Sequence, residues 1–527
     1  MKSLILLLVA IFLTDVLMYA QDGTPDPTFG GGDGLFYHSI FQDKASEGYA
    51  VALLQDQRII VVGSTLGPDG NLHAYLSRYH ADGSLDSSFN GSGIILPALP
   101  GYQSYSGGVK IQPDGKIVMS AWYEDTIGVY VAALRFSEDG VPDYTFDGDG
   151  QVSVRIPSKY SDISTMTLQP DGKILIGGYE GSEMKDSFMV LRFLSNGPLD
   201  HTFGGDGIVA TGVGEDYTDV NSVLVQSDGK IILAGYATFN GNKDFAVARY
   251  NANGTLDNTF SGDGITNITI SNKEDRANSC VLQPDNKILV SGFGYNNITE
   301  HQSFAVARLN PDGTLDNTFH GNGISLLHIT DYHDRVESMV LQPDGKIILS
   351  GYARSGDNNF DHVLAIARIT QDGLLDNTFD QDGVFMLPVQ ISLESQINYS
   401  ILQPDGKLLS TGIYRTGFLN QVMVFRTLTG LTTSAKEADQ SFKEVSLYPN
   451  PVKESMVLKY SLVKQETLRI TLFDRLGSVV DQLLENEKRN AGNHEEHLQL
   501  TNALAPGIYF VRMETVSGIK VIPMVKE

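Results

Sequence analysis

Five aromatic residues occupy the same place in successive copies of a repeated phrase, and their flat faces could bind a ligand. Each lies six residues after a recurring basic residue, and two further copies hold Ser64 and Ile413 at this place. The five candidate ligand-binding residues are Trp122, Tyr179, Tyr236, Phe293 and Tyr352. Aromatic faces stack on sugars and on peptides. The alternative is ordinary packing at the end of a strand, which requires no ligand.

A recurring arginine forms the second set of candidates. It ends an apolar run in every copy and is followed eight residues later by an aspartate, as in Arg249 and Asp257. Catalytic residues are normally unique in a chain, so repetition favours a structural role. An arginine beside buried apolar residues needs a partner, and we expect a buried contact with a carboxylate or carbonyl in each copy. The seven are Arg78, Arg135, Arg192, Arg249, Arg308, Arg368 and Arg426.

Other catalytic and metal-binding patterns point to no enzyme. The sequence has no Gly-x-Ser-x-Gly, His-Glu-x-x-His, Walker or Cys-x-x-Cys motif, and its eleven histidines have no metal-ligand spacing. We therefore assign no catalytic residue, no metal ligand and no cofactor. The turns at 251–257 and 310–316 are rich in Asn and Asp and resemble calcium loops, but they lack the full spacing and the terminal Glu. Calcium is thus the one cofactor left open.

These residues lie on copies of a single unit. The phrase Gln-Pro-Asp-Gly-Lys recurs with variants, and its basic residue falls at 58, 116, 173, 230, 287, 346 and 407. A second phrase, Asp-x-x-Phe, occurs seven times between Asp26–Phe29 and Asp376–Phe379. Together with the arginine, these markers appear seven times in the same order. The chain therefore contains an internal repeat of about 57 residues.

Each copy is expected to form four short strands. The first follows Asp-x-x-Phe, the second and third flank Pro-Asp-Gly, and the fourth ends at the arginine. Pro-Asp-Gly favours a hairpin because Pro presets φ, Asp caps its own backbone and Gly accepts the left-handed conformation. Four antiparallel strands repeated seven times predict an all-β fold, a seven-bladed β-propeller over residues 21–430. An open array is the alternative, but it would leave two end faces exposed.

The copies resemble the delta-60 repeat of bacterial exported proteins. The resemblance rests on the phrases Gln-Pro-Asp-Gly-Lys-Ile and Leu-Asp-x-x-Phe and covers about residues 22–430. The first copy departs from the pattern at Gln55–Arg58, and the last copy lacks a closing Leu-Asp-x-x-Phe. The resemblance implies an extracytoplasmic repeat protein and no defined activity.

The chain changes character after the repeats. Residues 431–443 are polar and predict a linker, and residues 444–527 alternate in short strands that predict a small Ig-like β-sandwich. Leu-Tyr-Pro-Asn-Pro at 447–451, Phe-Asp-x-x-Gly at 473–477 and Pro-Gly-Ile-Tyr-Phe-Val at 506–511 resemble the type A sorting domain of the type IX secretion system. The resemblance implies the secretion machinery as a partner and removal of this domain at the linker. It places the mature protein at the outer-membrane surface or outside the cell.

Residues 1–20 have the pattern of a signal peptide. Lys2 precedes an apolar run from Leu4 to Leu17, and we expect cleavage between Ala20 and Gln21. No other stretch is long and apolar enough for a transmembrane helix in the mature chain. The net charge of −25 argues against nucleic acid as a partner. The single cysteine, Cys280, falls at a core position of the repeat and is expected to behave as a small hydrophobic residue.

Together these features predict a secreted or surface-displayed propeller that acts as a binding or adhesion module, with a glycan or a protein as its ligand. Variation in length is concentrated between the third and fourth strands, for example at Asn296–Ser303 and Arg354–His362, and loops on a rigid scaffold often carry function. One alternative is an extracellular polysaccharide-degrading enzyme on the same scaffold. Another is a purely structural surface protein.

Overall fold

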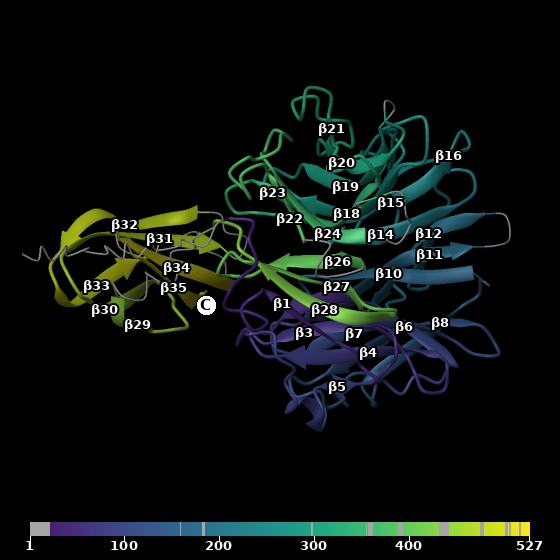
Figure 1. Ribbon diagram of the computed structural model, residues 1–527. Coiled ribbons are helices and arrows are strands. Elements are labelled where there is room, and N and C mark those ends of the chain that lie inside the picture. Colours follow the sequence, from purple (N-terminus) through teal and green to yellow (C-terminus); the bar gives the residue numbers. More distant parts are fainter. Residues whose placement is uncertain are drawn as a thin grey trace, which may run out of the picture. The chain divides into compact units, whose positions relative to one another are not determined.

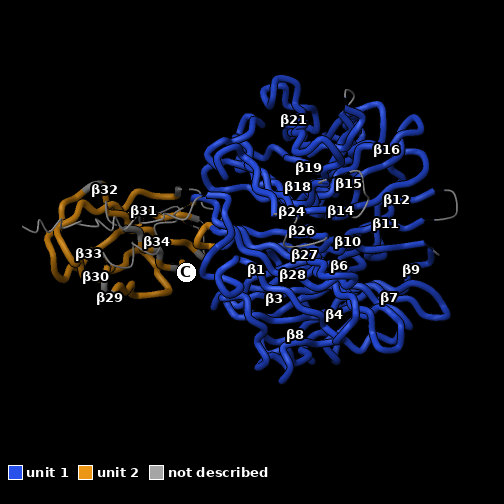
Figure 2. Tube along the Cα trace, viewed as in Figure 1, with its two compact units in different colours: residues 1–403, 407–430 blue, residues 404–406, 431–527 orange. Residues whose placement is uncertain are grey.

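The computed structural model divides into two compact units, residues 1–403 with 407–430 and residues 404–406 with 431–527 (Figure 2). It describes residues 22–526 except 159, 182–184, 297–298, 355, 357–361, 388–393, 432–441, 475–478, 501–503, 505–506 and 516–517. The predicted cleavage site at Ala20 and Gln21 lies outside the described residues, as do most of the predicted linker and parts of the two variable loops. Within the described chain, no helix is long and apolar enough to cross a membrane.

Seven four-stranded antiparallel sheets form the first unit, and they are the blades of a β-propeller (Figure 1). Blades 1 to 3 comprise, from the inner strand outwards, β2 (Ser46–Leu53), β3 (Ile59–Leu66), β4 (Leu72–Tyr79) and β5 (Ile94–Ile95); β6 (Gln103–Ile111), β7 (Ile117–Glu124), β8 (Val129–Phe136) and β9 (Gln151–Ile156); β10 (Tyr160–Leu168), β11 (Ile174–Gly181), β12 (Asp186–Phe193) and β13 (Ile208–Thr211). A short 3-10 turn, η1 (Phe89–Gly91), precedes β5.

Blades 4 to 7 repeat the same plan. They comprise β14 (Thr218–Val225), β15 (Ile231–Phe239), β16 (Asn242–Tyr250) and β17 (Ile265–Ile268); β18 (Arg276–Leu282), β19 (Ile288–Tyr295), β20 (Gln302–Leu309) and β21 (Ile324–Leu327); β22 (Asp334–Leu341), β23 (Ile347–Arg354), β24 (His362–Ile369) and β25 (Val384–Met386); and β26 (Glu394–Leu402), β27 (Leu408–Thr416), β28 (Leu419–Thr427) and β1 (Leu35–His38). The predicted all-β, seven-bladed propeller is confirmed.

The blades are displaced by one strand from the copies read in the sequence. The strand that follows each Asp-x-x-Phe turn pairs with the preceding arginine strand, so it becomes the outer strand of the previous blade. Blade 7 therefore takes its outer strand from the first copy of the repeat. β1 pairs with β28 from Leu35 opposite Phe425 to His38 opposite Val422. This pairing closes the ring.

The core of the propeller lies between neighbouring blades. The second and third strands of each blade are apolar on both faces, and their side chains interlock with those of the next blade. One such cluster joins Val118 and Val131 of blade 2 to Ile163, Ile174 and Ile176 on strands β10 and β11 of blade 3. Because each blade buries its faces only against its neighbours, a closed ring leaves no end face in water.

The seven recurring arginines form one contact repeated around the ring, here called the arginine clamp. In every copy the arginine Nε donates to the aspartate of the following turn at 2.6–2.8 Å. Its guanidinium lies 4.4–5.0 Å from the ring centre of the phenylalanine in Asp-x-x-Phe. Its Nη1 donates to a backbone carbonyl in the corresponding turn of the next blade, for example from Arg135 to Ser195 at 2.6 Å.

The final clamp links the last copy of the repeat to the first. Arg426 donates Nε to Asp26 at 2.6 Å and Nη1 to the Ala81 carbonyl of blade 1 at 2.6 Å. Lys407 also lies 3.0 Å from Asp26. The first Asp-x-x-Phe phrase therefore supplies the turn that the last copy lacks in the sequence. The chain of clamps runs from blade to blade without a break.

The second unit consists of two antiparallel sheets. One sheet contains β29 (Phe442–Tyr448), β30 (Ser455–Leu462) and β33 (Gly492–Gln499); the other contains β32 (Val479–Arg489), β31 (Glu466–Asp474), β34 (Gly507–Thr515) and β35 (Gly518–Lys526). Residues of both sheets, such as Leu458 and Ile470, share one buried core. This is the arrangement of a small Ig-like sandwich. Its first strand begins at Phe442, inside the segment that the sequence assigned to the linker.

We expect Asp26→Ala to destabilise the propeller by about 3–5 kcal/mol, because it leaves the buried cation of Arg426 without its carboxylate. Burial alone would raise the pKa of Asp26, but the hydrogen bonds from Thr28 and Lys407 outweigh it and lower the pKa to about 2. The carboxylate therefore stabilises the fold above the unfolded pKa, and this stability is lost as pH falls towards 2. Urea unfolding followed by fluorescence of Trp122, the only tryptophan, measures the change.

Asp263→Ala is the matched control, because Asp263 is an exposed turn residue of the repeat whose carboxylate accepts from the backbone N–H of Ile265 instead of from an arginine. It should cost less than about 1 kcal/mol. Equal losses for the two variants would contradict the closing role of the Asp26 clamp.

Candidate functional site

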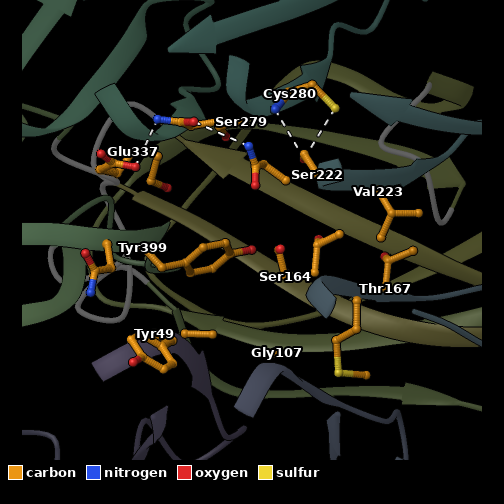
Figure 3. Close-up of a pocket in the computed structure, with 18 of the residues that line it drawn as sticks. Tyr49, Gly107, Ser164, Thr167, Ser222, Val223, Ser279, Cys280, Glu337 and Tyr399 are labelled. Atoms are coloured by element: carbon orange, nitrogen blue, oxygen red, sulfur yellow. Dashed lines mark hydrogen bonds between the residues drawn. The ribbon is translucent and has the colours of Figure 1, made fainter. Parts of the chain in front are cut away.

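The seven inner strands surround a central cavity of about 300 Å³. Every blade contributes to its lining, which is mostly polar (Figure 3). Tyr399 reaches into the cavity from β26, and its hydroxyl accepts a hydrogen bond from Lys110 of blade 2 at 3.2 Å. Glu337 also lines the cavity, where burial raises the pKa of its carboxyl to about 7 although the charge of Arg335 opposes the shift.

Every inner strand carries a β-bulge at the same place. Its pairing with the second strand shifts by one residue, as between Val220 and Ser222 in blade 4. The bulged residue always lies nine positions before the basic residue of the copy, as Asn221 does before Lys230. A bulge redirects side chains away from the regular ladder. The seven bulged residues are Tyr49, Gly107, Ser164, Asn221, Asn278, Glu337 and Asn398.

The side chains of bulged asparagines form hydrogen bonds at the unpaired edges of the inner strands. The Nδ2 groups of Asn221, Asn278 and Asn398 each donate to a backbone carbonyl of the next blade, at 2.9, 2.8 and 2.8 Å. The residue after the bulge assists, because Ser222 Oγ accepts from the Cys280 backbone N–H at 3.2 Å. An inner strand has no strand partner on its central side, so these bonds replace the missing ladder.

Two positions before each bulge lies a ring of side chains that we call the mouth layer. It sits at the end of the channel where the inner strands begin, opposite the Pro-Asp-Gly hairpins. Its members are Glu47, Tyr105, Asp162, Asp219, Arg276, Arg335 and Gln396, in blades 1 to 7. All are half-buried. Five residue types share these seven positions, whereas the clamp at the other end is nearly uniform.

The two arginines of the mouth layer rest on aromatic rings. The Arg276 guanidinium lies 4.9 Å from the Tyr236 ring centre, and Arg335 lies 4.4 Å from Phe293 and 5.9 Å from Tyr352. Arg335 Nε also donates to Gln302 at 2.7 Å, a contact between blades 5 and 6. Stacking on an aromatic face holds a guanidinium in place and leaves other N–H groups for a ligand.

The two aspartates of the mouth layer form no salt bridge among the described residues, although the charge of Arg276 acts on Asp219. Asp162 Oδ1 accepts only from the backbone N–H of Ile163, at 2.7 Å, and Asp219 Oδ1 is buried with no hydrogen-bond partner. Burial raises the pKa of both carboxyls to about 7, and for Asp219 the neighbouring charge of Asp162 adds to the rise. Each carboxyl is therefore partly protonated near neutral pH.

The five aromatic candidates form a second layer directly behind the mouth. Each pairs across its blade with the mouth residue, as Trp122 does with Tyr105, whose rings stack at 4.5 Å. Phe293 and Tyr352 are only 2% and 5% exposed, so they support Arg335 instead of offering a free face. Trp122, Tyr179 and Tyr236 are half-buried. Sequence reasoning found this layer because it repeats, and it missed the mouth layer because the mouth residues do not.

A positional signal for the mouth layer does exist in the sequence. Each mouth residue lies eleven positions before the basic residue of its copy, as Asp219 does before Lys230. Only the strand pairing places this position at the start of each inner strand, and the mouth residues are not among the described residues that line the central cavity. Cys280 is buried in the core between blades 4 and 5, and burial raises the pKa of its thiol to about 12.

The Asn- and Asp-rich turns use their oxygens within the protein. Asn253 Oδ1 accepts from the backbone and side chain of Thr255, and Asp257 accepts from Thr259 and Arg249. The described part of the chain contains no group of three or more His, Cys, Asp or Glu placed to hold a metal. Whether these turns bind calcium stays untested.

The strand topology is that of an all-β propeller followed in the chain by a small sandwich domain. Residues 54–89, 169–203, 226–260, 283–319 and 342–379 match the "Domain of unknown function (DUF5122) beta-propeller" family, and residues 446–526 match the "Secretion system C-terminal sorting domain". The chain therefore carries DUF5122 propeller repeats and a type IX secretion sorting domain, and it is exported to the cell surface or beyond. The family resemblances seen in the sequence are confirmed.

No curated protein matches the chain. Similar solved structures include a family PL25 ulvan lyase bound to a glucuronate–sulfated rhamnose unit, with 11% identity, coverage of 78% of this chain and 95% of that one, and a TM-score of 0.39. The β-propeller domain of the Trilobed protease from Pyrococcus furiosus has 12% identity, coverage of 74% and 97%, and a TM-score of 0.37. No functional assignment follows from either similarity.

We expect Asp219→Asn to stabilise the propeller increasingly as pH rises from about 4 to 7. The folded pKa of about 7 exceeds the unfolded value, so the wild-type protein loses stability across this interval while the amide does not. The charged groups that act on Asp219 are Asp162, Arg276 and Asp186. Melting temperatures measured between pH 4 and pH 8 give the difference.

Asp285→Asn serves as the control, because Asp285 is an exposed hairpin residue at the other end of the propeller. Its effect should not change over this pH range. A gain in stability for Asp219→Asn that is the same at pH 4 and pH 8 would show that the pKa of the Asp219 carboxyl is not raised in the folded protein.

Proposed function

We propose that the protein is an exported binding module whose ligand binds at the mouth of the channel. The observation that carries this proposal is the mouth layer, where one position of the repeat holds five different residue types, including both signs of charge. Structural positions of the repeat keep one residue type in nearly every blade, as the clamp does. The mouth positions are released from that constraint while staying half-exposed at one end of a rigid ring.

Exposed aromatic and apolar side chains surround the same end. They lie at the start of an inner strand, on the connection before one, or on the connection between the second and third strands of a blade, and Phe418 is 97% exposed. Solvent-exposed aromatic residues favour contact with a partner. The members at this end are Tyr102, Ile127, Tyr160, Tyr217 and Phe418. Tyr144 is equally exposed at the hairpin end and offers a control position.

A polysaccharide-cleaving enzyme is the second candidate. The observation in its favour is the pair of carboxyls of Asp162 and Asp219, because a pKa of about 7 suits a general acid near neutral pH. The binding proposal is preferred because the sequence contains no recognisable catalytic motif. The two candidates differ in whether a retained ligand is also cleaved.

The full chain, immobilised, is tested for retention of a panel of polysaccharides and of peptide pools, with reducing ends and new peptide termini measured in parallel. We expect retention without cleavage, and we expect Arg335→Gln to weaken it at least about tenfold. Tyr144→Ala should leave retention unchanged. Absence of retention, or retention that Arg335→Gln does not affect, would refute a binding site at the mouth. Cleavage abolished by Asp219→Asn would establish the enzyme.

A further inference from the structure

Four consecutive blades carry an ordered run of charge at the mouth. Asp162 and Asp219 lie on blades 3 and 4, and Arg276 and Arg335 lie on blades 5 and 6. The run therefore presents two carboxyls followed by two guanidinium groups along one arc of the ring. The remaining three positions include a single charged residue, Glu47 of blade 1.

The two halves of this arc form no direct ion pair with one another among the described residues. Asp219 and Arg276 occupy equivalent positions in adjacent blades, and the charge of Arg276 lowers the pKa of Asp219 without outweighing burial. Arg276 instead lies 3.0 Å from Glu274 of its own blade, and Arg335 is hydrogen-bonded to Gln302. The unpaired aspartates are thus a separate feature from the supported arginines.

The aspartate half is short of hydrogen-bond donors. Each carboxyl receives one backbone N–H, from Ile163 in Asp162 and from Val220 in Asp219, and Asp219 Oδ1 is shielded from water without a partner. A poorly solvated carboxylate is costly, and a ligand cation placed against the exposed part of these half-buried residues would offset some of that cost. Tyr179 pairs directly with Asp162 across blade 3. Tyr105 precedes it around the ring with a half-exposed ring.

A carboxyl pair bordered by tyrosine rings suits an ammonium or guanidinium group, which gains from both the charge and the aromatic faces. The arginine half suits a carboxylate, because guanidinium groups held on aromatic rings donate in a planar fork. A ligand that satisfies the whole arc carries a cation and an anion a short distance apart.

We propose that the mouth layer binds a peptide segment of mixed charge, with a basic side chain at Asp162 and Asp219 and an acidic side chain at Arg276 and Arg335. This inference rests on the proposed binding function and names its ligand class. Neutral and polyanionic glycans provide no cation for the aspartate pair, whereas a protein partner provides both charges on one chain. Charge complementarity along the arc also fixes the direction in which the peptide lies.

Four pools of fluorescein-labelled dodecapeptides test the proposal on the immobilised full chain. All pools share randomised Ala, Gly, Ser and Tyr positions and differ in containing Lys and Glu, Lys alone, Glu alone, or neither. We expect the mixed pool to be retained at least about tenfold more strongly than the neutral pool. The single-charge pools should fall between the two.

Two double variants assign the charges to their residues. Asp162→Asn with Asp219→Asn should remove the preference for Lys and keep that for Glu, and Arg276→Gln with Arg335→Gln should do the reverse. Arg335→Lys, which keeps the charge, should retain part of the preference for Glu. Asp285→Asn, at the hairpin end, should change nothing. Melting curves confirm that each variant is folded, and the single arginine variants replace the double one if it is not.

The failures of the two proposals are distinguishable. Equal retention of all four peptide pools, or a preference that the mouth variants leave intact, would overturn the peptide inference. Retention of an anionic polysaccharide that depends on Arg335, without peptide retention, would also overturn it while supporting a binding site at the mouth. If neither peptides nor polysaccharides were retained, the binding function itself would fall.

Discussion

The arginine clamp is the contact on which the rest of the propeller depends. Each arginine is buried, so its charge requires a carboxylate and its remaining N–H groups require acceptors. The aspartate and phenylalanine of the following turn provide the first part, and a carbonyl of the next blade provides the second. A blade therefore satisfies its own arginine only when its neighbour is in place. Each of the seven arginines needs a carbonyl of the next blade, so all seven are satisfied together only in a closed ring.

Closure also relates the order of the chain to the order of folding. The last arginine and its aspartate are 400 residues apart in sequence, and the outer strand of the last blade comes from residues 35–38. Contacts of such separation carry the largest loop-closure cost and form late. Blade 7 is thus completed only after all seven copies of the repeat are available. Its hydrogen bonds with β1 make the ring continuous instead of leaving two exposed sheet faces.

The two ends of the propeller have different roles because different constraints act on them. At the hairpin end, the Pro-Asp-Gly turns and the clamps keep almost one residue type at each position. At the mouth end, the strand edges are already satisfied one layer deeper, where bulged asparagines and neighbouring serines bond to the next blade. Most mouth residues carry no such duty, although Arg335 donates to Gln302 of blade 5. Chemistry can therefore vary there at little cost to the ring, and the charge that gathers there is only partly paired, as Arg276 is with Glu274.

The sequence by itself determined the number of copies, the four strands in each, the hairpin turns and the sorting domain, because turn residues and strand patterns act locally. Even the arginine clamp could be predicted from Arg249 and Asp257, since a buried charge demands a partner nearby in the chain. The displacement of blades from copies could not, because the turn residues mark where each strand begins and not which neighbouring strand it pairs with. The mouth layer was likewise beyond reach. Asp162, Asp219, Arg276 and Arg335 are ordinary polar residues in the sequence, and only the bulge and the seven-fold closure bring them together around one channel.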